Sequence, residues 1–186
     1  MFAYSERFDR VQLNANTLKV TQSEIAAAVK SCSRDALDAL GFAAKRIESY
    51  HVKQMPQDAF YRDEQGVRLG WRWRPLDSAG LYVPGGTASY PSSVLMNALP
   101  ARVAGVVRLV MVSPASGGAI NPLTLAAAHI AGVSEIYRVG GAQAVAALAY
   151  GTKSIAPVDK IVGPGNARSE EHTSELQSRF GISYAV

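Results

Sequence analysis

From about residue 80 onward, the sequence repeats one pattern, a short β-rich run that ends in a glycine-rich turn. The runs read "GLYVPGG", "RLVMVSPASGG", "EIYRVGGAQ" and "DKIVGPGN", and their starts are separated by 28, 27 and 24 residues. The segments between them are alanine-rich and helical in character; "NPLTLAAAHIAG" begins with Asn121 as a candidate N-cap and ends at Gly132. The sequence therefore predicts βαβ units and an α/β fold, with a parallel sheet covered by helices on both faces.

The residues before this repeat predict helices and one hairpin. "TQSE" at residues 21–24 is a capping-box signature, and "ALDALGFAAKRI" has apolar residues at three- and four-residue spacing. Alternating stretches in "AFYRDEQGVRLGWRWRPL" predict a β-hairpin. Its Trp71 and Trp73 would share one face, which is typical of core or interface residues. We interpret this part as the helical and hairpin front of a second, incomplete α/β lobe.

Composition narrows the class of protein. Hydrophobic residues make up 48% of the 186 residues, so the chain can build a packed core. The net charge is +4, but Lys and Arg form no long run, which argues against nucleic-acid binding. No apolar run approaches the length of a membrane span. The single cysteine, Cys32, allows no internal disulfide and suits a reducing compartment, so the sequence predicts a cytoplasmic protein without membrane association.

Three glycine-rich loops follow predicted strands, at Pro84–Gly86, Gly140–Gln143 and Gly163–Asn166. In a parallel sheet such loops emerge at one edge, where ligands bind. Glycine lets the backbone approach a ligand closely, and free amides at a helix N-terminus suit phosphate. The chain contains neither GxGxxG nor a P-loop motif, and each loop alone could be only a tight turn. Together the loops predict a site for a nucleotide or another phosphorylated ligand.

Three side chains at these loops suit such a ligand. Gln143 and Asn166 each offer a hydrogen-bond donor and an acceptor for ribose hydroxyls or an amide, and Tyr82 offers a flat apolar face with a polar tip. The histidines are less informative. His51 has no neighbours at metal-ligand spacing, and His129 is interpreted as a partly buried structural residue.

The same motifs carry a resemblance to a known family. "GLYVPGGTASYPSSVLMNALPARVAGV", "EIYRVGGAQAVAALAYGT" and "VDKIVGPGNA" closely resemble histidinol dehydrogenase, as do "YSERFDRVQL" and "RWRPLDSAGLYVPGG". The resemblance covers Met1 to about Ala167, with the loop motifs in family order. It implies an incomplete Rossmann-like lobe of a cytoplasmic homodimer that oxidises L-histidinol to L-histidine through the aldehyde, using two NAD⁺ in turn and a zinc ion.

The resemblance also assigns roles to residues. By motif match, the family's NAD contacts carry over onto Tyr82, Gln143 and Asn166. The family's zinc ligands and its Glu–His acid/base pair come later in the family sequence and have no counterpart here. The resemblance therefore implies no catalytic and no metal-binding residue in this chain, which is expected to be inactive by itself.

The chain is expected to divide into three segments: 1–78, the incomplete first lobe; 79–167, the NAD-binding lobe; and 168–186, a tail. The tail begins "RSEEHTSELQS", which departs from the family pattern and resembles the translation of a sequencing-library adapter. We interpret it as non-native, which makes its His172 and neighbouring glutamates no catalytic cluster. Two alternatives stay open: a related zinc- and NAD-dependent dehydrogenase of another alcohol, and a non-catalytic nucleotide-binding module.

Overall fold

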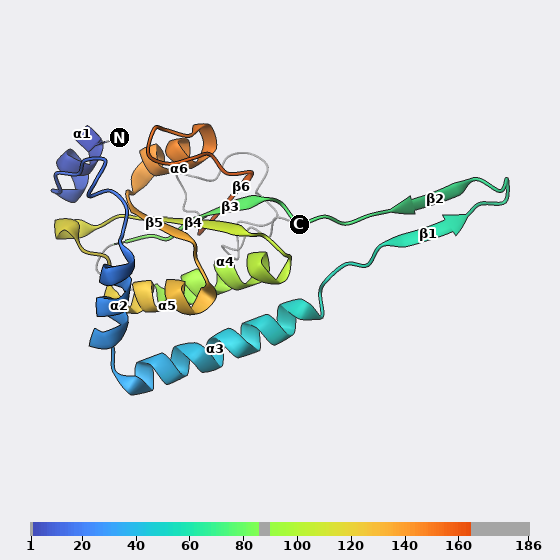
Figure 1. Ribbon diagram of the computed structural model, residues 1–186, viewed down its shortest axis with the longest axis horizontal. Coiled ribbons are helices and arrows are strands. Elements are labelled where there is room, and N and C mark those ends of the chain that lie inside the picture. Colours follow the sequence, from blue (N-terminus) through green and yellow to red (C-terminus); the bar gives the residue numbers. More distant parts are fainter. Residues whose placement is uncertain (1, 86–89, 165–186) are drawn as a thin grey trace.

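The computed structural model describes residues 2–85 and 90–164, and its centre is a four-stranded sheet (Figure 1). The strands lie in the order β5-β4-β3-β6, and each pairing between neighbours is parallel. They coincide with the four β-rich runs of the sequence, so the predicted α/β fold with a parallel sheet is confirmed. Their bounds are β3 (Ser78–Tyr82), β4 (Arg108–Ser113), β5 (Glu135–Arg138) and β6 (Lys160–Val162).

Helices cover both faces of this sheet, as predicted. Helices α4 (Pro91–Val103) and α5 (Pro122–Ala131) lie on one face, and α6 (Gly141–Tyr150) lies on the other (Figure 1). Side chains of a strand alternate between the two faces. Along β4, Leu109 and Met111 accordingly join the core with α4 and α5, whereas Val110 and Val112 join the core with α6.

Helix ends follow the predicted capping residues. Helix α2 (Gln22–Ser31) begins with the complete capping box of Thr21 and Glu24, as predicted. Helix α3 (Arg34–Val52), which follows it, is capped by the Ser33 side chain. The Asn121 side chain accepts a hydrogen bond from the Leu123 amide at 2.9 Å, and α5 ends at Gly132 in the left-handed conformation, with φ of 76°. These local signals therefore placed the helices correctly.

Helices α2 and α3 pack on the sheet domain through its helices α4 and α5. Ile25 and Ala28 of α2 and Ala44 of α3 belong to the same hydrophobic cluster as α4 and α5. Residues 18–20 also run beside the outer strand: the Val20 amide donates to the Ile136 carbonyl at 2.8 Å. The helical part of 1–78 thus shares the core of the parallel sheet. The remaining short elements are α1 (Phe2–Tyr4), η1 (Ser5–Asp9) and η2 (Ser116–Gly118).

The predicted hairpin is present and projects away from the body (Figure 1). Its strands, β1 (Ala59–Arg62) and β2 (Arg68–Trp71), pair antiparallel and are almost wholly exposed. Trp71 and Trp73 are 53% and 48% exposed, so they do not belong to the core in this chain. Within the described residues, no helix combines the length and apolarity needed to cross a membrane.

Candidate functional site: the carboxyl edge of the sheet

The carboxyl ends of the strands meet at one edge, and the glycine-rich loops emerge there as predicted. The strand order reverses at β3: β4 and β5 continue to one side of it, while β6 returns to the other side. Ligands of open α/β sheets bind at such a switch point. Gly163, which follows β6, lies against β3 there, since a Cβ built on it would come within 2.5 Å of the Tyr82 carbonyl oxygen.

The structure brings Tyr82 and Gln143 together at the start of α6. The Gly141 amide donates to the Tyr82 hydroxyl oxygen at 3.1 Å. The Gln143 side chain folds over the same glycine, because a Cβ built on Gly141 would lie 2.7 Å from Gln143 Oε1. Gly140 occupies the N-cap position and provides no side-chain cap. Asn166, the third predicted contact, lies outside the described residues.

Sequence reasoning missed Pro114, which follows β4 and lies between two of the glycine loops. A Cβ built on Gly140 would come within 2.3 Å of Pro114 Cγ, and one built on Gly85 within 2.9 Å of the Pro114 carbonyl oxygen. Cβ contacts below 3.0 Å are essentially never observed. These two glycines are therefore required by the packing of the loops against each other. The sequence feature that could have pointed to Pro114 is a proline directly after a buried strand.

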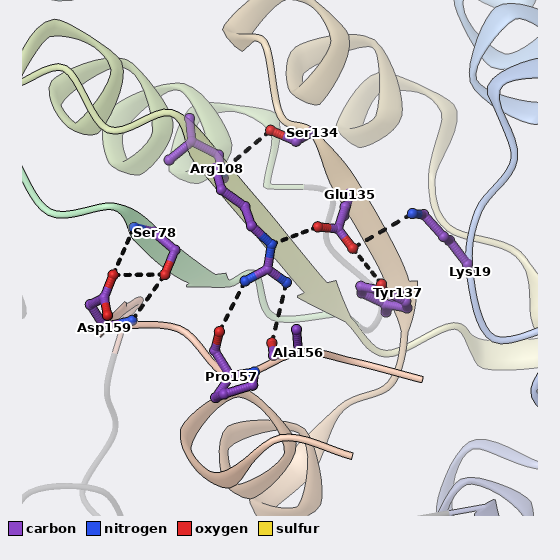
Figure 2. Close-up of polar contacts among 10 residues, drawn as sticks. Lys19, Ser78, Arg108, Ser134, Glu135, Tyr137, Ala156, Pro157 and Asp159 are labelled. Carbon is purple, nitrogen blue, oxygen red and sulfur yellow. Dashed lines mark hydrogen bonds and ion pairs between the residues drawn. The ribbon is translucent and has the colours of Figure 1, made fainter. Parts of the chain in front are cut away.

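At the opposite edge, a polar network ties the strand starts together (Figure 2). Arg108 Nε donates to Glu135 Oε1 at 2.7 Å, and its two terminal nitrogens donate to the carbonyls of Pro157 and Ala156. Arg108 therefore links β4 to β5 and to the segment that leads into β6. Lys19 Nζ lies 3.5 Å from Glu135 Oε2, so residues before α2 join the network as well.

This network shifts the pKa of its acidic members. Burial raises the pKa of Glu135, but the Tyr137 hydroxyl and Arg108 donate hydrogen bonds to the carboxylate, and these together with the charges of Arg108 and Lys19 lower the pKa below its usual value. Burial and the same carboxylate raise the pKa of Tyr137. Hydrogen bonds from the Ser78 hydroxyl and amide lower the pKa of Asp159. These side chains therefore hold the strands of the sheet together, and the pKa shifts result from that structural role.

Replacing Glu135 with Gln is expected to destabilise the fold at neutral pH by about 1 kcal/mol, because it removes the charge that Arg108 faces. A carboxyl group whose pKa is lower in the folded than in the unfolded protein stabilises the fold at pH values above its pKa in the unfolded chain, about 4.3. This contribution is lost as the pH falls through the lower pKa of the folded protein. Urea unfolding at several pH values should therefore show the two proteins converging toward a pH of about 3. Glu64→Gln, at an exposed position of the hairpin turn, is the matched control. A gap between Glu135→Gln and wild type that persists in acid would contradict this assignment.

Other candidate groups of the sequence lie apart from both edges. His51 lies in the last turn of α3, and Cys32 Sγ donates to the Ala28 carbonyl. His129 is exposed on α5, so its interpretation as a partly buried residue is wrong. Among the described residues, no group of three or more His, Cys, Asp or Glu side chains could hold a metal ion. His172 lies outside the described residues.

The structure also has a cavity that the sequence did not indicate. Its volume is about 590 Å³, and it lies beside the outer strand β5, between residues 10–24 and the turn at Gly117–Gly118. Two of its cations are already paired: Arg138 contacts Glu24, and Lys19 contacts Glu135.

Comparisons with known proteins agree with this architecture. The sequence model of the family described as histidinol dehydrogenase matches residues 1–184. The histidinol dehydrogenase of Rhizobium meliloti is 65% identical over 179 residues, which covers 96% of this chain and 41% of the relative. That of Rhodopseudomonas palustris is 62% identical over 178 residues, with the same coverage of each chain. The crystal structure of histidinol dehydrogenase from Elizabethkingia anophelis superimposes with a TM-score of 0.85 at 33% identity and covers 98% of this chain and 42% of that one.

The chain is much shorter than its relatives: it spans about 41% of the length of the curated relatives. The family match continues past Ala167 to residue 184, so it lends no support to the prediction that residues 168–186 are non-native. That segment lies outside the described residues, and the prediction stays a prediction.

Proposed function

The chain belongs to the histidinol dehydrogenase family, and from this premise we propose that it forms the NAD⁺-binding part of an enzyme that oxidises L-histidinol to L-histidine. The observation that carries the proposal is the placement of Tyr82 and Gln143 beside the start of α6, at the edge where the strand order reverses. The family resemblance further supports a cytoplasmic homodimer, which we propose for the full-length protein.

The residues at this edge fit a dinucleotide. The Gly141 amide is bonded to Tyr82, but the amides that follow it in the first turn of α6 suit a pyrophosphate, because a helix N-terminus carries positive partial charge. The Tyr82 hydroxyl accepts from Gly141, so its own hydrogen can be donated to the ligand. Gln143 can both donate to and accept from ribose hydroxyls or the nicotinamide amide. When bound there, NAD⁺ would accept the hydride that leaves the alcohol carbon.

Zinc does not fit the described part of the chain. Its ligands would have to converge on one point, and the described His, Cys, Asp and Glu side chains form no such group. We therefore assign no step of the reaction to zinc within these residues.

Gln143→Ala is expected to weaken NAD⁺ binding by about 0.5–1.5 kcal/mol, because it removes one polar contact. Asn166→Ala, at a position outside the described residues, should have a similar effect. Titration of the chain with NAD⁺, followed by saturation-transfer NMR, measures the affinity. The matched control is Gln65→Ala, which makes the same change in the exposed hairpin turn. Unchanged affinity in both loop variants would overturn the site assignment.

A further inference from the structure

Pro114 lies between two glycine-rich loops, the one after β3 and the one after β5. It follows β4, which pairs with β5 on one side and with β3 on the other. The close approaches described above place its ring against Gly140 and its carbonyl against Gly85. The proline thus touches the loop after β5 and the loop after β3 at the same time.

The backbone at Gly140 shows that contact with Pro114, and not conformation, requires glycine there. Gly140 has φ of −124° and ψ of −176°, which is extended backbone that any residue adopts. Gly141 differs in both respects: its φ is +70°, and a Cβ built on it would meet the side chain of Gln143 instead of Pro114. The two adjacent glycines are therefore needed for different physical reasons.

We propose that Pro114 is a positioning residue for the cofactor site, an inference that rests on the proposed NAD⁺ binding. Gly140 is the N-cap of α6, and the next amide donates to the Tyr82 hydroxyl. By holding Gly140 in place, Pro114 determines where α6 begins relative to β3. Because Tyr82 ends β3 and Gln143 lies in the first turn of α6, this also determines the distance between these two side chains. A proline suits this task because its ring has no flexible side-chain torsions and its φ is fixed.

A double-mutant cycle tests this contact. Gly140→Ala is expected to weaken NAD⁺ binding about tenfold or more, because the added methyl group displaces α6 from Pro114. Pro114→Ala removes Cγ and Cδ, which would lie 2.3 and 3.0 Å from the added methyl group, and keeps Cβ at 2.7 Å, so it relieves the larger part of the clash. The double variant should therefore bind more tightly than the product of the single effects predicts, with a coupling of about tenfold. Gly141→Ala serves as the control, because Pro114→Ala should not rescue it.

A loss of stability must be distinguished from a loss of positioning. Pro114→Ala alone should weaken NAD⁺ binding severalfold. Ile155→Val serves as the comparison, because it removes one methyl group from a fully buried side chain of the core and leaves only a small cavity. It should lower the melting temperature without changing the NAD⁺ affinity. Both quantities are measured on the 186-residue chain, by saturation-transfer NMR with NAD⁺ and by circular dichroism.

The results separate the positioning role from the proposed function. NAD⁺ binding by the wild type with additive effects of Gly140→Ala and Pro114→Ala would overturn the positioning role alone. An unchanged affinity in Pro114→Ala would do the same. Failure of the wild-type chain to bind NAD⁺ at millimolar concentration would overturn the proposed function, and the positioning role with it.

Discussion

The 186-residue chain is expected to form no NADH when it is mixed with L-histidinol, NAD⁺ and Zn²⁺. Oxidation of an alcohol needs a base that takes the hydroxyl proton while the hydride leaves. The described loop residues after β3, β4, β5 and β6 include no His, Asp, Glu, Lys or Cys. His51 and His129 lie on α3 and α5, away from the loops at the carboxyl edge of the sheet. The described residues at the edge proposed to bind NAD⁺ thus include none of these acid–base groups.

The assay follows NADH absorbance with purified chain, and a heat-inactivated sample provides the blank. The full-length histidinol dehydrogenase of Rhizobium meliloti, 65% identical over the shared part, is the positive control for the reagents. Turnover above the blank would require a catalytic group among residues that we assign to structure.

Leu148→Ala is expected to cost about 2–5 kcal/mol of unfolding free energy, the largest stability effect that we predict. Leu148 is fully buried on the face of α6 that packs on the sheet. It lies directly over β3, since a Cβ built on Gly80 would come within 2.9 Å of Leu148 Cδ1. Truncation leaves a cavity between helix and sheet that the rigid strands cannot close.

Urea unfolding followed by far-ultraviolet circular dichroism measures this loss. Val145→Ala is the matched control, because Val145 lies on the same helix and is 40% exposed; its change should stay within about 0.5 kcal/mol. A loss below about 1 kcal/mol for Leu148→Ala would show that α6 does not pack on the sheet as described.

Local signals predicted most of the sheet domain. The four β-rich runs became the four strands, and Thr21, Asn121 and Gly132 became helix caps, because strand period and capping chemistry act over a few residues. The loops of Tyr82 and Gln143 reached one edge because parallel strands all end there. Asn166 stays a prediction, since it lies outside the described residues.

Contacts between distant residues could not be predicted in this way. The Arg108–Glu135 ion pair joins two strands 27 residues apart, and the Ser78–Asp159 hydrogen bond spans 81 residues. Nothing in the local pattern of α2 and α3 showed that their apolar faces would cover α4 and α5. The steric role of Pro114 likewise depends on which strands flank β4, and strand order is a property of the whole chain.

The projecting hairpin determines what the protein's intrinsic tryptophan emission can report. The chain has two tryptophans, and both, Trp71 and Trp73, lie in or directly after β2. Both are about half exposed, and the hairpin has no third strand among the described residues. A two-stranded ribbon of this kind can open without the core unfolding. Tryptophan fluorescence therefore reports on the hairpin and on whatever covers it, whereas the parallel sheet and the loops at its carboxyl edge contribute no tryptophan to that signal.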